Sequence, residues 1–319
     1  MNIAVSMIDG TCYSAENRGN VYLLRRKLVN NEDEGQVASY RQGPGTYSDD
    51  KLSDSIYGAN LDRIVLSQYR DLAAKCYMED GDESWGVALF GFSRGAFAVR
   101  ILGALLDCIG LPMDPEDDVH YAPILRGAME SPYTYKLTKD QKRMFYRPEI
   151  VYMGLFDTVN ATLKFDSKPF TNPPKCARCI RHAVSINESG KSFNYVPFRE
   201  SANVEEKLFA GEHCDVGGGV DVKERALSNV ALAWIANGAI AAGLKFKEPG
   251  MLSEAIDPSA VVPHDSSKDI SRLPNNHYRR VFQKYNVPHA SVATLKVSPF
   301  KEGCVPLLSS EFKEMYSRV

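Results

Sequence analysis

The stretch ALFGFSRGAFAVR, residues 88–100, decides the fold of this chain. Its first half is an apolar run typical of a buried strand, and its second half, from Arg94 onward, is typical of a largely buried helix. Between the two halves, Gly91 and Gly95 flank Ser93 in the pattern G-x-S-x-G. In this context the pattern predicts a nucleophile elbow, a sharp turn that holds a serine hydroxyl out from the edge of a sheet.

The environment of Ser93 favours catalysis over a purely structural turn. The predicted helix after Ser93 begins with free backbone amides, and its dipole places partial positive charge at the same point. A tight strand–helix junction with an inert serine is the alternative interpretation. We predict that Ser93 is a nucleophile.

Strand and helix patterns alternate along the rest of the chain. The expected strands are continuous apolar runs, which are typical of a parallel sheet covered by helices on both faces. The sequence therefore predicts an α/β fold with a mostly parallel sheet and helices on both faces. The expected strands are 3–8, 36–42, 85–92, 149–156 and 205–211, and the expected helices are 20–29, 61–78, 94–110, 179–186 and 226–244.

Two segments depart from this alternation. Residues 111–147 contain prolines, an acidic cluster and mixed tyrosine and basic residues, so we expect an insertion that serves as a lid. Residues 245–319 are rich in proline, and we expect a C-terminal extension that packs on a core formed by residues 1–244. Both segments are expected to form walls over Ser93.

Composition excludes several classes of function. The chain has 319 residues, is 44% hydrophobic and carries a formal net charge of -2, which gives no electrostatic reason to expect nucleic-acid binding. The N-terminus lacks the pattern of a secretory signal, and no apolar run approaches the roughly 20 residues of a spanning helix. We therefore expect a cytoplasmic protein whose membrane contact, if any, is peripheral.

The seven cysteines predict neither a disulfide framework nor a metal site. Their number is odd and most of them are scattered, which fits a reducing compartment. Cys176 and Cys179 have a spacing seen in zinc sites, but no second pair lies near them, and a structural zinc needs four ligands. We expect no metal and no cofactor.

A serine nucleophile needs a base and an acid that orients the base. Two pairs follow Ser93 in the order found in α/β-hydrolases, namely Asp157 with His213 and Asp215 with His289. Asp157 closes a clear strand, and His213 follows another. The sequence pattern alone leaves both pairs open.

The oxyanion that forms during acyl transfer needs two hydrogen-bond donors. One is expected to be the amide of Arg94, directly after the nucleophile. The other is expected from the turn that follows the first strand, at Gly10 and Thr11. In a different class of enzyme Asp9 would be a phosphatase nucleophile, but the second carboxylate expected two residues later is replaced by Thr11.

Several motifs together resemble one known family. DGT, GPGT, GFSRGA, GLFDTV, HAVSINE, HCDVGGG and LSNVALAWI occur in this order. They are similar to the α/β-hydrolase family that was long catalogued only as a domain of unknown function, and that includes phospholipase effectors of the bacterial type VI secretion system. The resemblance covers residues 3–244. Two positions depart from the usual HSDVGGGY, since Cys214 replaces the serine and Val220 the tyrosine.

The resemblance implies a serine esterase that cleaves lipid esters. Carried over by motif, the serine of GFSRGA is Ser93, the aspartate of FDTV is Asp157 and the histidine before DVGGG is His213. It also implies a lipid or small-ester substrate and export as an effector without a signal peptide. A binding module that has kept the fold but not the activity is the alternative.

Overall fold

The chain is described from a computed structural model. The described residues are 1–11, 13–45, 61–77, 85–160, 167–188, 193–248, 250–255, 257, 280, 282 and 286–294. The expected turn GPGT ends outside this range, and so does most of the expected C-terminal extension.

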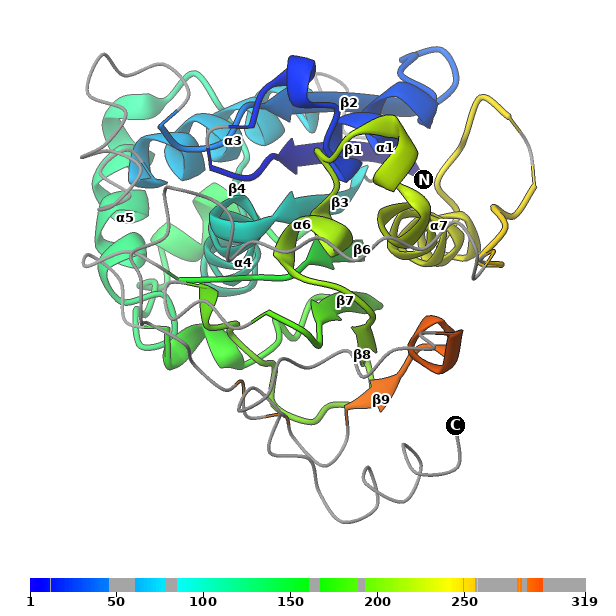
Figure 1. Cartoon of the computed structure of the whole chain (residues 1–319). Helices are drawn as coiled ribbons and strands as arrows, with labels where there is room; N and C mark the ends of the chain where they lie inside the picture. The colour runs from blue at the N-terminus through cyan, green and yellow to red at the C-terminus, as the bar shows by residue number, and fades with distance from the viewer. Residues whose placement is uncertain are drawn as a thin grey trace.

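A seven-stranded sheet forms the centre of the described structure (Figure 1), with strand order β2-β1-β3-β6-β7-β8-β9. Every neighbouring pair in this sheet is parallel, which confirms the predicted sheet type. The strands are β1 (Asn2–Ile8), β2 (Gln36–Arg41), β3 (Trp85–Phe92), β6 (Ile150–Phe156), β7 (Ile180–Ser185), β8 (Val204–Phe209) and β9 (Val287–Pro288).

Helices cover both faces of this sheet, as predicted (Figure 1). One face packs on α3 (Leu61–Lys75) and α4 (Ser93–Cys108), and α5 (Asp118–Glu130) packs on α4 in the same buried cluster. The other packs on α1 (Asn20–Lys27) and α7 (Ala226–Ala241).

The interior strand β3 is an unbroken apolar run because both of its faces are covered by helices. All eight of its residues are buried. Because side chains alternate across a strand, Val87 and Leu89 join the cluster with α3, α4 and α5, whereas Ala88 and Phe90 join the cluster with α1 and α7. A strand between two helical layers therefore needs apolar residues at every position.

The prediction of a helix over residues 179–186 is wrong, because this segment is strand β7. Its six residues are fewer than a typical helix has, and β-branched Ile180 and Val184 suit a strand. A short apolar run fits a buried strand and a buried helix equally well by periodicity alone. The correction matters because β7 carries His182 into the interior, where the side chain is fully buried.

The predicted insertion at residues 111–147 contributes a layer of the core. It contains α5 and a two-stranded antiparallel sheet of β4 (Leu111–Pro112) and β5 (Phe145–Tyr146). Tyr121 and Leu125 of α5 are buried in the same cluster as α4. Its role as a lid stays a prediction.

The described part of the C-terminal segment packs on the edge of the sheet. Lys207 and Leu208 of β8 pair with Val287 and Pro288 of β9. Phe282 lies with Leu208 in a third buried cluster. Among the described residues, no helix is long and apolar enough to span a membrane.

The contact between α4 and the end of β1 yields a stability prediction. A Cβ on Gly95 would lie 2.1 Å from the backbone oxygen of Asp9, so Gly95→Ala forces backbone apart and is expected to cost about 1–3 kcal/mol of unfolding free energy. Gly103→Ala in the same helix is the matched control. Its Cβ would meet side chains and no backbone, namely the end of the flexible Met153 side chain, the ring of Pro174 and, at an ordinary contact distance, Ile150. Alanine also favours the helix by about 1 kcal/mol over glycine.

Denaturant unfolding of both variants measures this difference. Gly95→Ala should be less stable than the native protein, and Gly103→Ala should be equal to it or more stable. Equal stability of the two variants would contradict the close approach of α4 to β1.

Candidate active site

The register of the parallel strands brings four loops to one edge of the sheet. Ile8 of β1 pairs with Gly91 of β3, so the turn after β1 lies beside Ser93. Phe92 of β3 pairs with Phe156 of β6, so Asp157 lies on the other side of Ser93. In a parallel sheet all strands end at the same edge, which is where ligands bind in open α/β folds.

The first residues after β3 and β6, Ser93 and Asp157, have an unusual backbone conformation. Ser93 has φ 57° and Asp157 has φ 39°, in the left-handed region that residues other than glycine rarely adopt. Such conformations cost of order 1–3 kcal/mol and cluster at functional sites. At Ser93 the conformation is the one expected of a nucleophile elbow.

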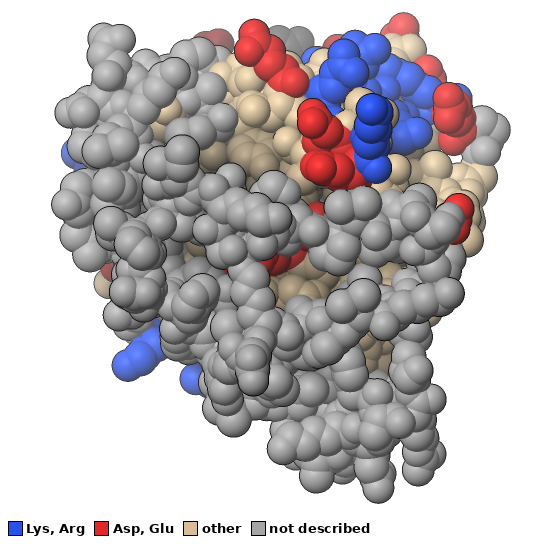
Figure 2. Space-filling model, viewed as in Figure 1, with Lys and Arg blue, Asp and Glu red and all other residues tan. Residues whose placement is uncertain are grey.

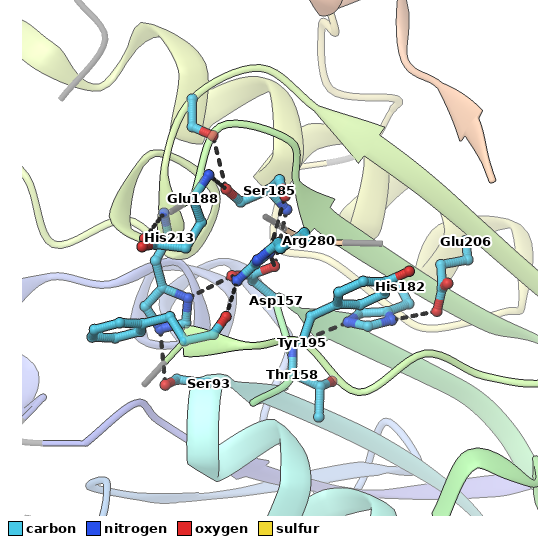
Figure 3. Close-up of polar contacts among 12 residues, drawn as sticks. Ser93, Asp157, Thr158, His182, Ser185, Glu188, Tyr195, Glu206, His213 and Arg280 are labelled. Carbon is cyan, nitrogen blue, oxygen red and sulfur yellow. Dashed lines mark hydrogen bonds and ion pairs between the residues drawn. The ribbon is translucent and has the colours of Figure 1, made fainter. Parts of the chain in front are cut away.

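His213 connects the two side chains (Figure 3). Its Nδ1 lies 2.6 Å from Asp157 Oδ2, and its Nε2 lies 2.9 Å from Ser93 Oγ. A carboxylate only accepts hydrogen bonds, so Nδ1 carries the proton and Nε2 accepts from the serine hydroxyl. The three residues are nearly or fully buried, and we call them the Ser93–His213–Asp157 relay.

Local packing fixes the imidazole of His213. The residue opens α6 (His213–Gly217), and its backbone amide donates to Glu188 Oε2 at 3.2 Å. Its ring lies between those of Phe92 and Phe193, with centroids 4.6 and 4.7 Å away. The DVGGG motif contributes to this packing through Gly217. A Cβ at this position would lie 2.0 Å from the Phe92 ring and would clash with it. Glycine at this position lets Phe92 support the histidine.

The alternative pair of Asp215 and His289 has other contacts. Asp215 Oδ2 accepts the amide of Glu212 at 2.9 Å and so caps α6. The ring of His289 stacks on Phe209, and its Nε2 lies 3.2 Å from Glu254 Oε2. The geometry therefore favours His213 over His289 as the partner of Ser93.

Arg280 is a member of the site that sequence reasoning missed. Its Nη1 lies 2.6 Å from Asp157 Oδ1 and its Nη2 lies 2.8 Å from Asp157 Oδ2, a bidentate ion pair that is buried on both sides. Burial raises the pKa of Asp157, but the charge of Arg280 and hydrogen bonds from His213 and Arg280 outweigh it, and the pKa lies well below its usual range. A lone arginine in a proline-rich segment carries no motif that would have revealed it.

A second buried network holds the backbone beside Asp157 (Figure 3). The amide of Thr158 donates to His182 Nε2 at 3.0 Å, and His182 Nδ1 lies 2.7 Å from Glu206 Oε2. Since Nε2 accepts a hydrogen bond, Nδ1 carries the proton and donates it to the carboxylate. Burial lowers the pKa of His182, although Glu206 raises it. The network ties the end of β6 to β7 and β8.

The hydrogen bonds of the turn after β1 show which of the predicted oxyanion donors, Gly10 or Thr11, already has a partner. The amide of Gly10 donates to the carboxylate of its neighbour Asp9 at 2.8 Å, and the hydroxyl of Tyr40 donates to the other oxygen of Asp9 at 2.7 Å. The hydroxyl of Thr11 is buried and has no hydrogen-bond partner among the described residues. The Gly10 amide thus already donates to Asp9, whereas the Thr11 hydroxyl donates to no group in the described part of the chain.

Cysteine placement gives no metal centre in the described part of the chain. No three His, Cys, Asp or Glu side chains there are grouped so that they could hold an ion. Cys176 and Cys179 are free thiols, and burial raises the pKa of Cys176 to about 12. A thiol with such a pKa stays protonated, which disfavours metal binding.

Asp9 yields a prediction about stability and pH. Burial raises its pKa from 3.8 to about 6, against the opposing hydrogen bonds from Tyr40 and Gly10. Between these two pH values the folded protein holds more protons than the unfolded chain, so stability falls as pH rises through this interval. Asp9→Asn should therefore be more stable than the native protein at pH 8, by up to about 3 kcal/mol, with no such gain at pH 3.5.

Unfolding in urea at the two pH values tests this expectation. Asp33→Asn, at an exposed position, is the control and should change stability at neither pH. A variant of Asp9 that is less stable than the native protein at pH 8 would show that the hydrogen bonds of the charged carboxylate outweigh the cost of burying it.

Comparison with known proteins shows the family to which this chain belongs. The model of the type VI secretion system (T6SS) phospholipase effector Tle1-like catalytic domain matches residues 3–238. The uncharacterized protein YEL023C of Saccharomyces cerevisiae is 29% identical over 224 residues, which are 61% of this chain and 32% of the yeast protein. The chain thus corresponds to less than half the length of that relative.

Two solved structures are also similar. An uncharacterized protein from Pseudomonas aeruginosa has a TM-score of 0.48 at 16% identity, covering 81% of this chain and 48% of that one. The Tle1 effector bound to the VgrG spike of the type 6 secretion system has a TM-score of 0.41 at 16% identity, covering 71% of this chain and 53% of that one. The family match runs from β1 into α7 and includes Ser93, Asp157 and His213, and the chain belongs to the family of Tle1-like T6SS phospholipase effector catalytic domains.

Proposed function

We propose that this protein is a serine esterase that hydrolyses the carboxylic esters of lipids, most specifically phospholipids. The observation that carries the proposal is the Ser93–His213–Asp157 relay, with contacts of 2.9 and 2.6 Å at the carboxyl edge of a parallel sheet. Membership of a phospholipase family supports the lipid substrate. The reaction forms an acyl-enzyme on Ser93.

The relay supplies the proton transfers of such a reaction. Ser93 Oγ attacks the acyl carbonyl carbon while His213 Nε2 takes the hydroxyl proton, and a tetrahedral oxyanion forms. His213 then gives this proton to the leaving alcohol as the ester bond breaks and the acyl-enzyme remains. Water then attacks the acyl group while His213 takes its proton, and His213 returns this proton to Ser93 Oγ as the acyl–serine bond breaks and the fatty acid leaves. Asp157 holds the imidazole in the required tautomer throughout.

Two groups are proposed to stabilise the oxyanion. The first is the amide of Arg94, which follows Ser93 directly in the first turn of α4, the position that supplies one oxyanion donor at a nucleophile elbow. The second is the turn of Gly10 and Thr11, whose place beside Ser93 follows from the pairing of Ile8 with Gly91. Because the Gly10 amide donates to Asp9, we favour Thr11 as the second donor.

An activity-based probe tests the nucleophile. A fluorophosphonate should label the native protein, and Ser93→Ala should lose the label together with at least about a thousandfold of its activity on p-nitrophenyl butyrate and on phosphatidylcholine vesicles. Ser131→Ala, at an exposed serine, is the control and should keep both.

Three results would contradict the proposal in different ways. Labelling of Ser93→Ala at the native level would remove Ser93 from the mechanism. Hydrolysis of the short ester without hydrolysis of the vesicles would leave an esterase but remove the phospholipid substrate. Saturable binding of lipid without labelling or hydrolysis would favour a binding module that has kept the fold.

A further inference from the structure

Arg280 enters the site from outside the segment that matches the family model, which ends at residue 238. The side chain is 2% exposed, and besides Asp157 it donates to the backbone oxygens of Ser185, at 2.9 Å, and Phe193. Four hydrogen bonds thus fix the guanidinium. A buried arginine with this many acceptors is held in one orientation and cannot be a solvated surface charge.

The chain around Arg280 is anchored to the sheet at several points. Phe282 packs on Tyr195, with ring centroids 5.6 Å apart. Asn286 donates to Glu206 Oε1 at 2.7 Å, and the next two residues form β9 beside β8. These contacts bring the guanidinium to the Asp157 carboxylate, which His213 also contacts (Figure 3).

We propose that Arg280 is a positioning residue that clamps the Asp157 carboxylate and offsets its charge, so that hydrolysis continues at lower pH than a relay without the arginine would permit. This inference rests on the proposed esterase function. We further infer that the C-terminal segment completes the active site. Apart from a protonated His213, Arg280 of this segment is the only described cation bonded to Asp157.

Charge explains the direction of the effect. His213 accepts the serine proton only while it is neutral, and an uncompensated carboxylate beside it favours the protonated imidazolium. Arg280 offsets that charge and so opposes this bias toward the imidazolium. Without Arg280 the buried Asp157 would either hold its charge beside the imidazole or take up a proton, and both changes impair the base at acidic pH.

Other charged groups near Asp157 do not reverse this direction. Glu188, which accepts the amide of His213, is an additional carboxylate and also favours the imidazolium. Burial lowers the pKa of His182, which disfavours a positive charge on this residue. The phenol of Tyr195 lies under Arg280, with 5.5 Å from the guanidinium to the ring, and is uncharged at the pH of the test.

The test compares pH profiles of kcat/KM for the native protein, Arg280→Gln and Arg280→Lys. In Arg280→Gln the acidic limb should move up by about one pH unit or more, and kcat should fall about tenfold to a hundredfold. Arg280→Lys keeps the charge but loses the planar fork, so its acidic limb should stay near the native position while kcat falls. Arg178→Gln removes an exposed arginine that pairs with Glu149 and is the control.

Each outcome either supports or overturns the inference. An Arg280→Gln variant with native kcat and a native acidic limb overturns it, and so does an Arg280→Lys variant whose limb moves as far as that of the glutamine variant. If Arg280→Gln does not fold, the Arg280→Lys variant decides the question. A native kcat in Arg280→Lys would show that the planar guanidinium does not clamp Asp157. Fluorophosphonate labelling of the native protein separates the two proposals, because an unlabelled native protein refutes the esterase function and not the role of Arg280 alone.

Discussion

The site depends on one constraint, which is that all seven strands run in the same direction and end at one edge. Pairing of Ile8 with Gly91, and of Phe92 with Phe156, sets the turn after β1 and the turn after β6 on either side of Ser93. A shift of one residue in either pairing would turn the side chains of a strand to the opposite face. The positions of Ser93 and Asp157 are thus determined by the same hydrogen bonds that hold the sheet together.

Close packing then limits which residues can occupy this edge. Gly95 lets α4 approach the backbone of β1, and Gly217 lets the ring of Phe92 lie against α6. The same ring contacts His213, so the spacing of the glycines determines where the imidazole lies. The motifs GFSRGA and DVGGG describe two sides of a single contact, although about 120 residues separate them in the chain.

The sequence predicted the parts of the structure that have local patterns. The order of strands and helices followed from apolar periodicity, and the turn at Ser93 followed from its two glycines. The segment 179–186 was predicted wrongly because a short apolar run has no distinguishing period, and with it the network of His182 and Glu206 was missed. Arg280 was missed for a different reason, since its role depends on a contact across 123 residues of chain that no local pattern records.

Two buried aspartates at the same edge of the sheet show how hydrogen-bond and ion-pair partners set the pKa of a carboxylate. Asp157 receives a guanidinium and an imidazole, and its pKa lies well below the usual range. Among the described residues, Asp9 receives only the hydroxyl of Tyr40 and the amide of Gly10, and burial raises its pKa to about 6. The guanidinium and the imidazole thus favour the charged form of Asp157, whereas burial of Asp9 predicts that its charged form lowers stability. The same carboxylate accepts a hydrogen bond from the amide of Gly10, so a group that is predicted to lower stability also constrains the turn after β1.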